Sequence, residues 1–383
     1  RLITGGARLG KADRSLSPAS VTVHEFGHQY WYGLVGTDEF RHAWMDEGFC
    51  TFSTQRVLAK AFRPEWSTYP VLGHEFYGKA PLQWPAYGSK DLRSLFTLTR
   101  LETPAFSRIP AVSAELWRPN SLLRYFAEIP PVSYWPKVVD DAVLGKRRAY
   151  RTDFYQPIST RSSELFEWNL RGVNTYSRPA MTLETMARLM GESRWIRTMR
   201  AYYERYRFKH PRPEDWFEVV KEFGAGAMVG EDGSEDSLPV DWTSFWRQAY
   251  AGNQVMDFGV HRLVNLPHFE DDASQPSRVK LLPDHWDVHV ELRRMGNFSV
   301  PVEIELHWED GQSSRHVWDG RKPTWAFREL GSPLQVLQVV IDPERKLVLD
   351  KNWLNNSRTV TPEEDFAFEA GVRALLWAQA MLH

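Results

Sequence analysis

The pentapeptide His-Glu-Phe-Gly-His contains two histidines four residues apart, His24 and His28, and Glu47 follows after eighteen intervening residues. Residues four apart lie on one face of an α-helix, so both imidazoles can point at a common centre. Two imidazoles and one carboxylate form a known zinc ligand set, which leaves a fourth position open for water. The sequence therefore predicts one Zn²⁺ per chain, held by His24, His28 and Glu47.

Glu25 directly follows the first of these histidines, beside the metal but not on it. A carboxylate at this position suits a general base for the metal-activated water. Two helical histidines are also common as plain surface or core residues, and Glu47 could simply stabilise a helix dipole. The metal interpretation is favoured because both segments have an apolar side that would face a core: Phe26, Tyr30, Trp31 and Leu34 in the first, and Trp44, Phe49 and Phe52 in the second.

The spacing of His-Glu-x-x-His and the later Asp-Glu-Gly-Phe resembles the gluzincin metallopeptidases of the M1 aminopeptidase family. A second match is the segment 174–183, Asn-Thr-Tyr-Ser-Arg-Pro-Ala-Met-Thr-Leu. Family members carry a tyrosine there that hydrogen-bonds the tetrahedral intermediate, so the resemblance implies that Tyr176 is an oxyanion donor beside the zinc. Without the family context, Tyr176 is one of fourteen tyrosines and a structural role is the simpler interpretation.

The resemblance implies a zinc-dependent peptidase that removes N-terminal residues from peptides. Glu25 would take a proton from the zinc-bound water as it attacks the scissile carbonyl, and return it to the leaving amine. Tyr176 would share the oxyanion with zinc. Asp46 either accepts a hydrogen bond that orients a ligand histidine or is a solvated charge. Two alternatives stay open: a gluzincin endopeptidase, and a catalytically silent peptidase-like scaffold.

The chain departs from the family in two respects. It contains neither the Gly-x-Met-Glu-Asn segment, whose glutamate holds the free amine of the substrate, nor the N-terminal β domain. We therefore expect an upstream segment or a partner chain to supply them. The choice between exopeptidase and endopeptidase rests on the resemblance, not on residues of this sequence.

Composition limits the class of protein. A chain of 383 residues with 42% hydrophobic and 25% charged residues suits a soluble protein of two or three domains. The net charge of −2 argues against nucleic-acid binding, and the single cysteine, Cys50, excludes an intrachain disulfide. No signal peptide is visible at the start, and no apolar run approaches the roughly twenty residues of a membrane span. The compartment is left open.

The predicted fold class is α+β and multidomain. A thermolysin-like, mostly helical catalytic domain is expected over residues 1–277, a β-sandwich over 278–360, and an amphipathic terminal helix over 361–383, which would dock on the body rather than on a membrane. Helices are predicted at 180–190, 195–206, 213–223 and 242–250, and an exposed loop at 224–237. Strands are predicted at 286–293, 300–308, 314–318, 324–327, 334–341 and 346–349.

Residues 61–172 differ from the rest of the catalytic domain because proline recurs among aromatic residues and few helical periods survive. The distance from Glu47 to Tyr176 is also longer than expected for the family, so this stretch is interpreted as an insertion. It would form either a lid over the substrate cleft or an embellishment packed on the outside.

Overall fold

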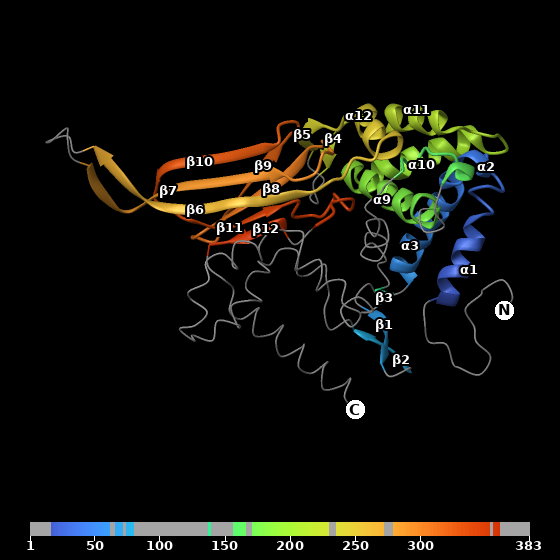
Figure 1. The fold of residues 1–383 in the computed structure, drawn as a ribbon, viewed down its shortest axis with the longest axis horizontal. Coiled ribbons are helices and arrows are strands. Elements are labelled where there is room, and N and C mark those ends of the chain that lie inside the picture. Colours follow the sequence, from blue (N-terminus) through green and yellow to red (C-terminus); the bar gives the residue numbers. More distant parts are fainter. Residues whose placement is uncertain are drawn as a thin grey trace.

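The computed structural model describes residues 17–61, 66–71, 74–79, 137–138, 156–165, 171–229, 235–271, 279–352 and 355–360. Helices gather at one end of this part of the chain and long antiparallel strands at the other (Figure 1). The predicted α+β class is therefore confirmed. The predicted terminal helix lies outside the described residues, as does most of the predicted insertion.

The helical end is built from short α-helices interrupted by π-helical turns. The α-helices are α1 (Ser17–Gly27), α2 (Glu39–His42), α3 (Phe49–Ala61), α9 (Arg178–Met190), α10 (Glu192–Tyr206), α11 (Pro213–Phe223) and α12 (Trp242–Trp246). The π-helical turns are η1 (Trp44–Gly48), η5 (Val173–Ser177) and η6 (Arg247–Ala251), and η4 (Ser162–Glu164) is a short 3₁₀ helix. No helix in the described part of the chain is long and apolar enough to cross a membrane.

Local sequence explains where several helices begin and end. Helix α11 has Pro213 at its first position, and the Asp215 carboxylate accepts a hydrogen bond from the backbone N–H of Arg212 at 2.7 Å. Proline and an acidic first turn both favour a helix start, and this helix spans the predicted range. Gly191 separates α9 from α10 with a φ of 75°, a conformation that other residues rarely adopt.

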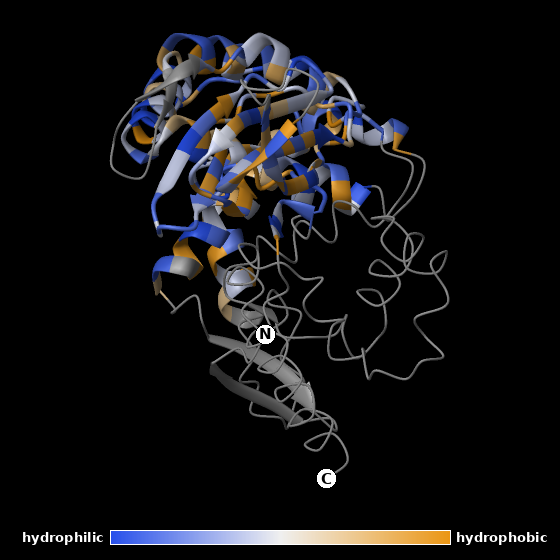
Figure 2. Ribbon diagram, turned by 90° about the vertical axis from the view of Figure 1, so that its left-hand side faces the viewer, coloured by the Kyte–Doolittle hydropathy of each residue, from blue (hydrophilic) through white to orange (hydrophobic). Residues whose placement is uncertain are grey.

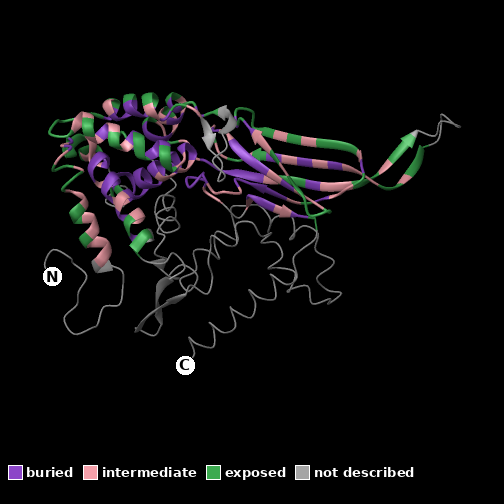
Figure 3. Cartoon of the chain, turned by 180° about the vertical axis from the view of Figure 1, so that it is seen from behind, coloured by how far each residue is buried: buried purple, intermediate pink, exposed green. Residues whose placement is uncertain are grey.

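Helix α9 is the centre of the helical end, since nearly all of its residues are buried (Figure 3). Aromatic rings from three neighbouring elements pack beside it. Phe49 and Tyr202 each lie about 5 Å, centroid to centroid, from the ring of Trp216, at 5.1 and 5.0 Å. Such edge-to-face contacts stabilise a core beyond simple burial of area. This core holds the segments that carry the candidate site.

The strands form two main antiparallel sheets. One has the order β10-β7-β6, with β6 at Phe258–Asp271, β7 at Val279–Arg294 and β10 at Thr324–Ser332. The other has the order β12-β11-β8-β9, with β8 at Val302–Trp308, β9 at Ser313–Trp318, β11 at Val336–Ile341 and β12 at Ser357–Thr359. Hydrophobic and hydrophilic residues mix along these strands (Figure 2). Aromatic rings join the two sheets, with Phe258 5.3 Å from Trp318 and Trp308 6.2 Å from Phe327.

Two smaller sheets complete the described strands. Strands β1 (Trp66–Val71), β2 (His74–Lys79) and β3 (Lys137–Val138) form one with the order β2-β1-β3, inside the range interpreted as an insertion. Strands β4 (Ala227–Val229) and β5 (Glu235–Pro239) pair with each other, and most of their residues lie in 224–237, the region predicted to be an exposed loop. The loop prediction is therefore wrong for the strand residues. The glycine- and acid-rich composition of this region gave no sign that its residues would pair as strands.

Two strand predictions need correction. Strand β6 lies in the range assigned to the catalytic domain, yet it pairs with β7 from Phe258 to Asp271. Register shifts interrupt this pairing. They break the alternation of apolar and polar residues by which a strand is predicted from sequence. Residues 346–349 form no strand. This segment is buried, and the Asp342 carboxylate accepts the backbone N–H groups of Lys346 and Leu347 in place of a strand partner, at 2.9 and 2.7 Å.

Candidate metal centre

The two histidines lie on either side of the end of helix α1. The helix ends at Gly27, so His24 lies in its last turn and His28 is the first residue beyond it. The chain then turns, with Tyr30 N–H donating to the Gly27 carbonyl at 2.9 Å. The two imidazole rings are 4.9 Å apart and nearly perpendicular. The prediction that both point at one place agrees with this geometry, although the helix is shorter than expected.

Glu47 lies in the π-helical turn η1, immediately before α3. A π-helical turn adds one residue to the helical ladder, and such turns are frequent at functional sites. Here the two adjacent acids of the turn reach the same imidazole from opposite sides. Asp46 contacts Nδ1 of His28, and Glu47 lies near its Nε2. The turn therefore presents two neighbouring carboxylates to one ring.

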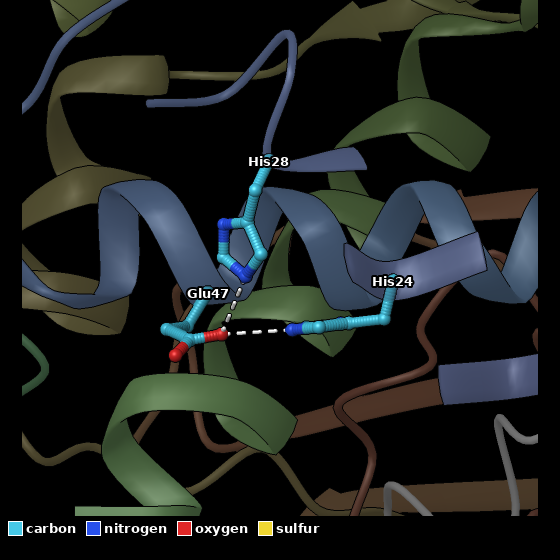
Figure 4. A group of neighbouring side chains, drawn as sticks. All are labelled: His24, His28 and Glu47. Atoms are coloured by element: carbon cyan, nitrogen blue, oxygen red, sulfur yellow. Dashed lines mark hydrogen bonds and ion pairs between the residues drawn. The ribbon is translucent and has the colours of Figure 1, made fainter. Parts of the chain in front are cut away.

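The Glu47 carboxylate brings the predicted ligands together (Figure 4). Its Oε2 lies 2.8 Å from Nε2 of His24 and 3.4 Å from Nε2 of His28, and the three donor atoms are within 4.8 Å of one another. Zinc bonds of about 2.0–2.1 Å in a tetrahedron place ligand atoms roughly 3.4 Å apart. The donor set therefore fits a zinc ion, with a small outward movement of His24 from its direct hydrogen bond to Glu47.

Asp46 holds the outer nitrogen of His28. Its Oδ1 lies 2.6 Å from Nδ1 of His28, and the carboxylate is almost wholly buried, with 1% of its side chain exposed. Burial raises the pKa of Asp46 to about 8, and a hydrogen bond with Glu39 acts in the same direction, against the influence of His28. An Nδ1–H bonded to a carboxylate leaves Nε2 available for a metal. Asp46 thus occupies the place expected of a residue that orients a ligand.

Charge in the site raises the proton affinity of His28. Burial acts to lower the pKa of His28, but the charge and hydrogen bond of Asp46, followed by the charges of Glu47 and Glu25, raise it above its ordinary value. Glu47 shows the converse behaviour. Burial acts to raise its pKa, but hydrogen bonds from His24 and Tyr176 bring it below its ordinary value. Without a metal, His28 therefore holds a proton more readily than an ordinary histidine, and Glu47 releases one more readily than an ordinary glutamate.

Tyr176 reaches the same carboxylate from the opposite segment. It lies in the π-helical turn η5, and its hydroxyl donates to Oε1 of Glu47 at 2.5 Å, so it uses the oxygen that the histidines do not contact. The side chain is 37% exposed. Burial of the hydroxyl and its hydrogen bond to Glu47 raise the pKa of Tyr176, so it remains a protonated donor at neutral pH.

Glu25 lies on the exposed side of α1, one residue after His24. Its charge contributes to raising the pKa of both His28 and Tyr176. The structure therefore brings His24, His28, Glu47, Tyr176 and Asp46 into contact, with Glu25 at the edge of the group.

Cys50 also lies beside His28 and Asp46, a position that the sequence did not predict. Its sulfur lies 3.4 Å from Nδ1 of His28 and 3.9 Å from Oδ1 of Asp46. Burial raises the pKa of the thiol, so it packs as a neutral group beneath the histidine. The spacing could have predicted this position, because Asp46 and Cys50 are four residues apart and helical residues at that spacing share a face.

Comparison with known proteins adds little to this description. No protein-family model matches the sequence, and no curated protein matches it. Among solved structures, the chain is similar to Legionella pneumophila aminopeptidase A in complex with aspartic acid, with a TM-score of 0.40 and 11% identity over 85% of this chain. The match covers 26% of that aminopeptidase. A likeness this low establishes neither a shared family nor a shared activity.

Proposed function

We propose that the chain is a zinc-dependent peptidase of the M1 aminopeptidase type, with His24, His28 and Glu47 as ligands. One observation carries the proposal: side chains from α1, η1 and η5 meet at a single carboxylate, that of Glu47. Glu47 and Tyr176 are separated by 129 residues in the sequence, yet their side chains are hydrogen-bonded. A thermolysin-like layout of the helical end is part of the same proposal, as is a structural role for the two main sheets.

In the proposed peptide hydrolysis, each residue of the site has a separate role. A bound zinc ion would supply a Lewis acid and bring the pKa of a water molecule toward neutrality. Glu25 accepts the proton of the attacking water and returns it to the leaving amine. The Tyr176 hydroxyl exchanges its present acceptor, Glu47, for the oxyanion of the intermediate. Asp46 keeps His28 in the tautomer that a metal requires.

The preference for free N-termini is the second part of the proposal, and it rests on the resemblance to the M1 family. It is tested by comparing aminoacyl-anilides that have a free amine with the same compounds N-acetylated, on this chain and on the longest natural form. Hydrolysis of the free-amine series alone supports an aminopeptidase. Equal hydrolysis of both series would favour an endopeptidase, and no hydrolysis by a zinc-loaded protein would favour a silent scaffold.

A further inference from the structure

Tyr176 is bracketed by two buried polar residues that bind the same backbone segment. Asn174 lies two positions before the tyrosine and is 2% exposed, and Arg178 lies two positions after it and is 7% exposed. Nδ2 of Asn174 donates to the carbonyl of Gln156 at 2.8 Å, and Nη1 of Arg178 donates to that same carbonyl at 3.0 Å. The two side chains therefore converge on one oxygen from opposite sides of the tyrosine.

Each side chain also makes a second contact to the backbone. Asn174 donates from Nδ2 to the carbonyl of Pro157 at 3.4 Å, and Arg178 donates from Nη2 to the carbonyl of Gly252 at 3.3 Å. The receiving segment is itself anchored, because the backbone N–H of Ser159 donates to the carbonyl of Tyr250 at 2.9 Å. The π-helical turn η5 is thereby tied to the end of η6 through groups inside the core.

The turn that carries Tyr176 is also held by packing and by its own backbone, where the N–H of Arg178 donates to the carbonyl of Val173. Its remaining residues are buried, whereas the tyrosine side chain points outward to Glu47. A π-helical turn is usually a single turn with i→i+5 hydrogen bonds, so outside contacts add to the few bonds that fix its backbone. The distance from the tyrosine hydroxyl to an oxyanion must be held within a few tenths of an ångström for the donor to be effective.

We propose that Asn174 and Arg178 are positioning residues that clamp the turn η5 and so set the place of the Tyr176 hydroxyl for catalysis. This inference rests on the proposed function, because it assigns the clamp to the oxyanion donor of that reaction. The clamp leaves the tyrosine side chain free to change its hydrogen-bond acceptor while its backbone stays in place.

The test uses the zinc-loaded full chain and the variants Asn174→Ala, Arg178→Met and Arg178→Lys. The first two remove donors, while lysine keeps the charge and N–H donors but not the planar fork of the guanidinium group, so it is the milder change. We expect kcat to fall by about tenfold or more for Asn174→Ala and Arg178→Met, with KM and zinc content nearly unchanged, because a displaced donor costs transition-state stabilisation. Arg178→Lys should recover part of the lost kcat.

A double-mutant cycle with Tyr176→Phe separates positioning from general stability. If the clamp acts through the hydroxyl, adding Asn174→Ala to Tyr176→Phe changes kcat by less than about twofold, since residues that act as a unit are not additive. A full additional loss in the Phe background, or a loss explained by lower zinc content, would overturn the proposal. Arg178→Lys in both backgrounds gives the same comparison if the larger changes prevent folding.

Hydrogen exchange distinguishes failure of the clamp from failure of the proposed function. We expect backbone amides of residues 171–178 to exchange faster in Asn174→Ala than in the wild type, while amides of α11 keep their rates. Faster exchange in a protein that hydrolyses no peptide would leave the clamp in place and reject the peptidase assignment. Unchanged exchange with unchanged kcat in an active enzyme would reject the clamp alone.

Discussion

Gly48 and Pro179 lie so close that a β-carbon added to Gly48 would stand 2.5 Å from Cβ of Pro179. Gly48 follows Glu47 in η1, and Pro179 follows η5, which carries Tyr176. The two π-helical turns therefore approach each other at a point where no side chain fits. This approach allows the tyrosine hydroxyl to reach the glutamate.

Gly48→Ala should push the two turns apart. We expect the free energy of unfolding to fall by about 1–3 kcal/mol, the usual cost of overpacking a rigid contact, and zinc affinity to fall with it because Glu47 moves. Gly172→Ala is the matched control, since nothing lies within 4 Å of its added β-carbon and its φ of −59° is helical. Denaturant unfolding and zinc titration measure both effects. A Gly48→Ala protein as stable as the control would contradict the close approach.

Asp46→Asn should weaken zinc binding without unfolding the protein. The substitution turns the carboxyl group that contacts Nδ1 of His28 into an amide of the same shape. Loss of such an outer partner typically costs 10–100-fold in metal affinity. Glu218→Gln on α11 is the control, because it changes the same charge at an exposed position. Competition with a chromophoric chelator gives the affinities, and equal values for the two variants would mean that Asp46 does not orient the histidine.

Zinc affinity should fall as the pH is lowered. The pKa of His28 is above its ordinary value, so a proton competes with the metal over a wider range than for an ordinary histidine. Below that pKa, zinc must displace a proton from His28 in order to bind, so its affinity falls roughly tenfold for each unit by which the pH is lowered. The same chelator competition at several values between about pH 5.5 and 8 tests this. An affinity that does not change with pH would show that the metal is bound elsewhere.

Asp342 should make the protein less stable as the pH rises through the acid range. Burial raises the pKa of Asp342 to about 6 from 3.8, against the hydrogen bonds that it accepts from the backbone of Leu347 and Lys346. The folded state thus binds the proton more tightly than the unfolded state. Stability from this group is present below the unfolded pKa and is lost as the pH rises to about 6, by about 3 kcal/mol in all.

The substitution Asp342→Asn isolates this contribution. Asparagine tolerates the backbone φ of 52° found at this position and cannot ionise. We expect the difference in unfolding free energy between wild type and variant to change steadily between about pH 4 and 6 and to level off above. A difference that stays constant over this interval would mean that Asp342 titrates at its ordinary value.

The helices that bury one regular face could be predicted from the sequence, and the π-helical turns could not. Apolar spacing and proline predicted α11 at residues 213–223, and the region of α12 and η6 was predicted as one continuous helix. A π-helical turn inserts one residue without changing composition, so periodicity does not reveal it. Asn174 and Arg178 were missed for a related reason, since their partners are backbone carbonyls that no side-chain pattern marks.

The candidate ligands were predictable because their chemistry restricts spacing, whereas their geometry depends on packing. The pattern around His24 and His28 predicted a shared centre, but it did not predict that α1 ends at Gly27, where the helix packs closely against α3. A β-carbon on Gly27 would lie 3.3 Å from the sulfur of Cys50. Strand β6 escaped prediction because its register shifts near Val260 and Pro267 break the alternation. Strand β6 forms because it pairs with β7, which is distant in sequence at its far end, and not because of the local propensity of its residues.

The most direct test of the account measures zinc content and hydrolysis of free-amine aminoacyl-anilides together, for the wild type and for Glu25→Gln. Glu204→Gln on α10 is the control, an exposed acid outside the site. We predict one zinc per chain in all three proteins, and a loss of turnover of at least about hundredfold for Glu25→Gln alone, the scale expected for removing a general base. A Glu25→Gln protein with wild-type turnover, or a wild type that binds no zinc, would contradict the account.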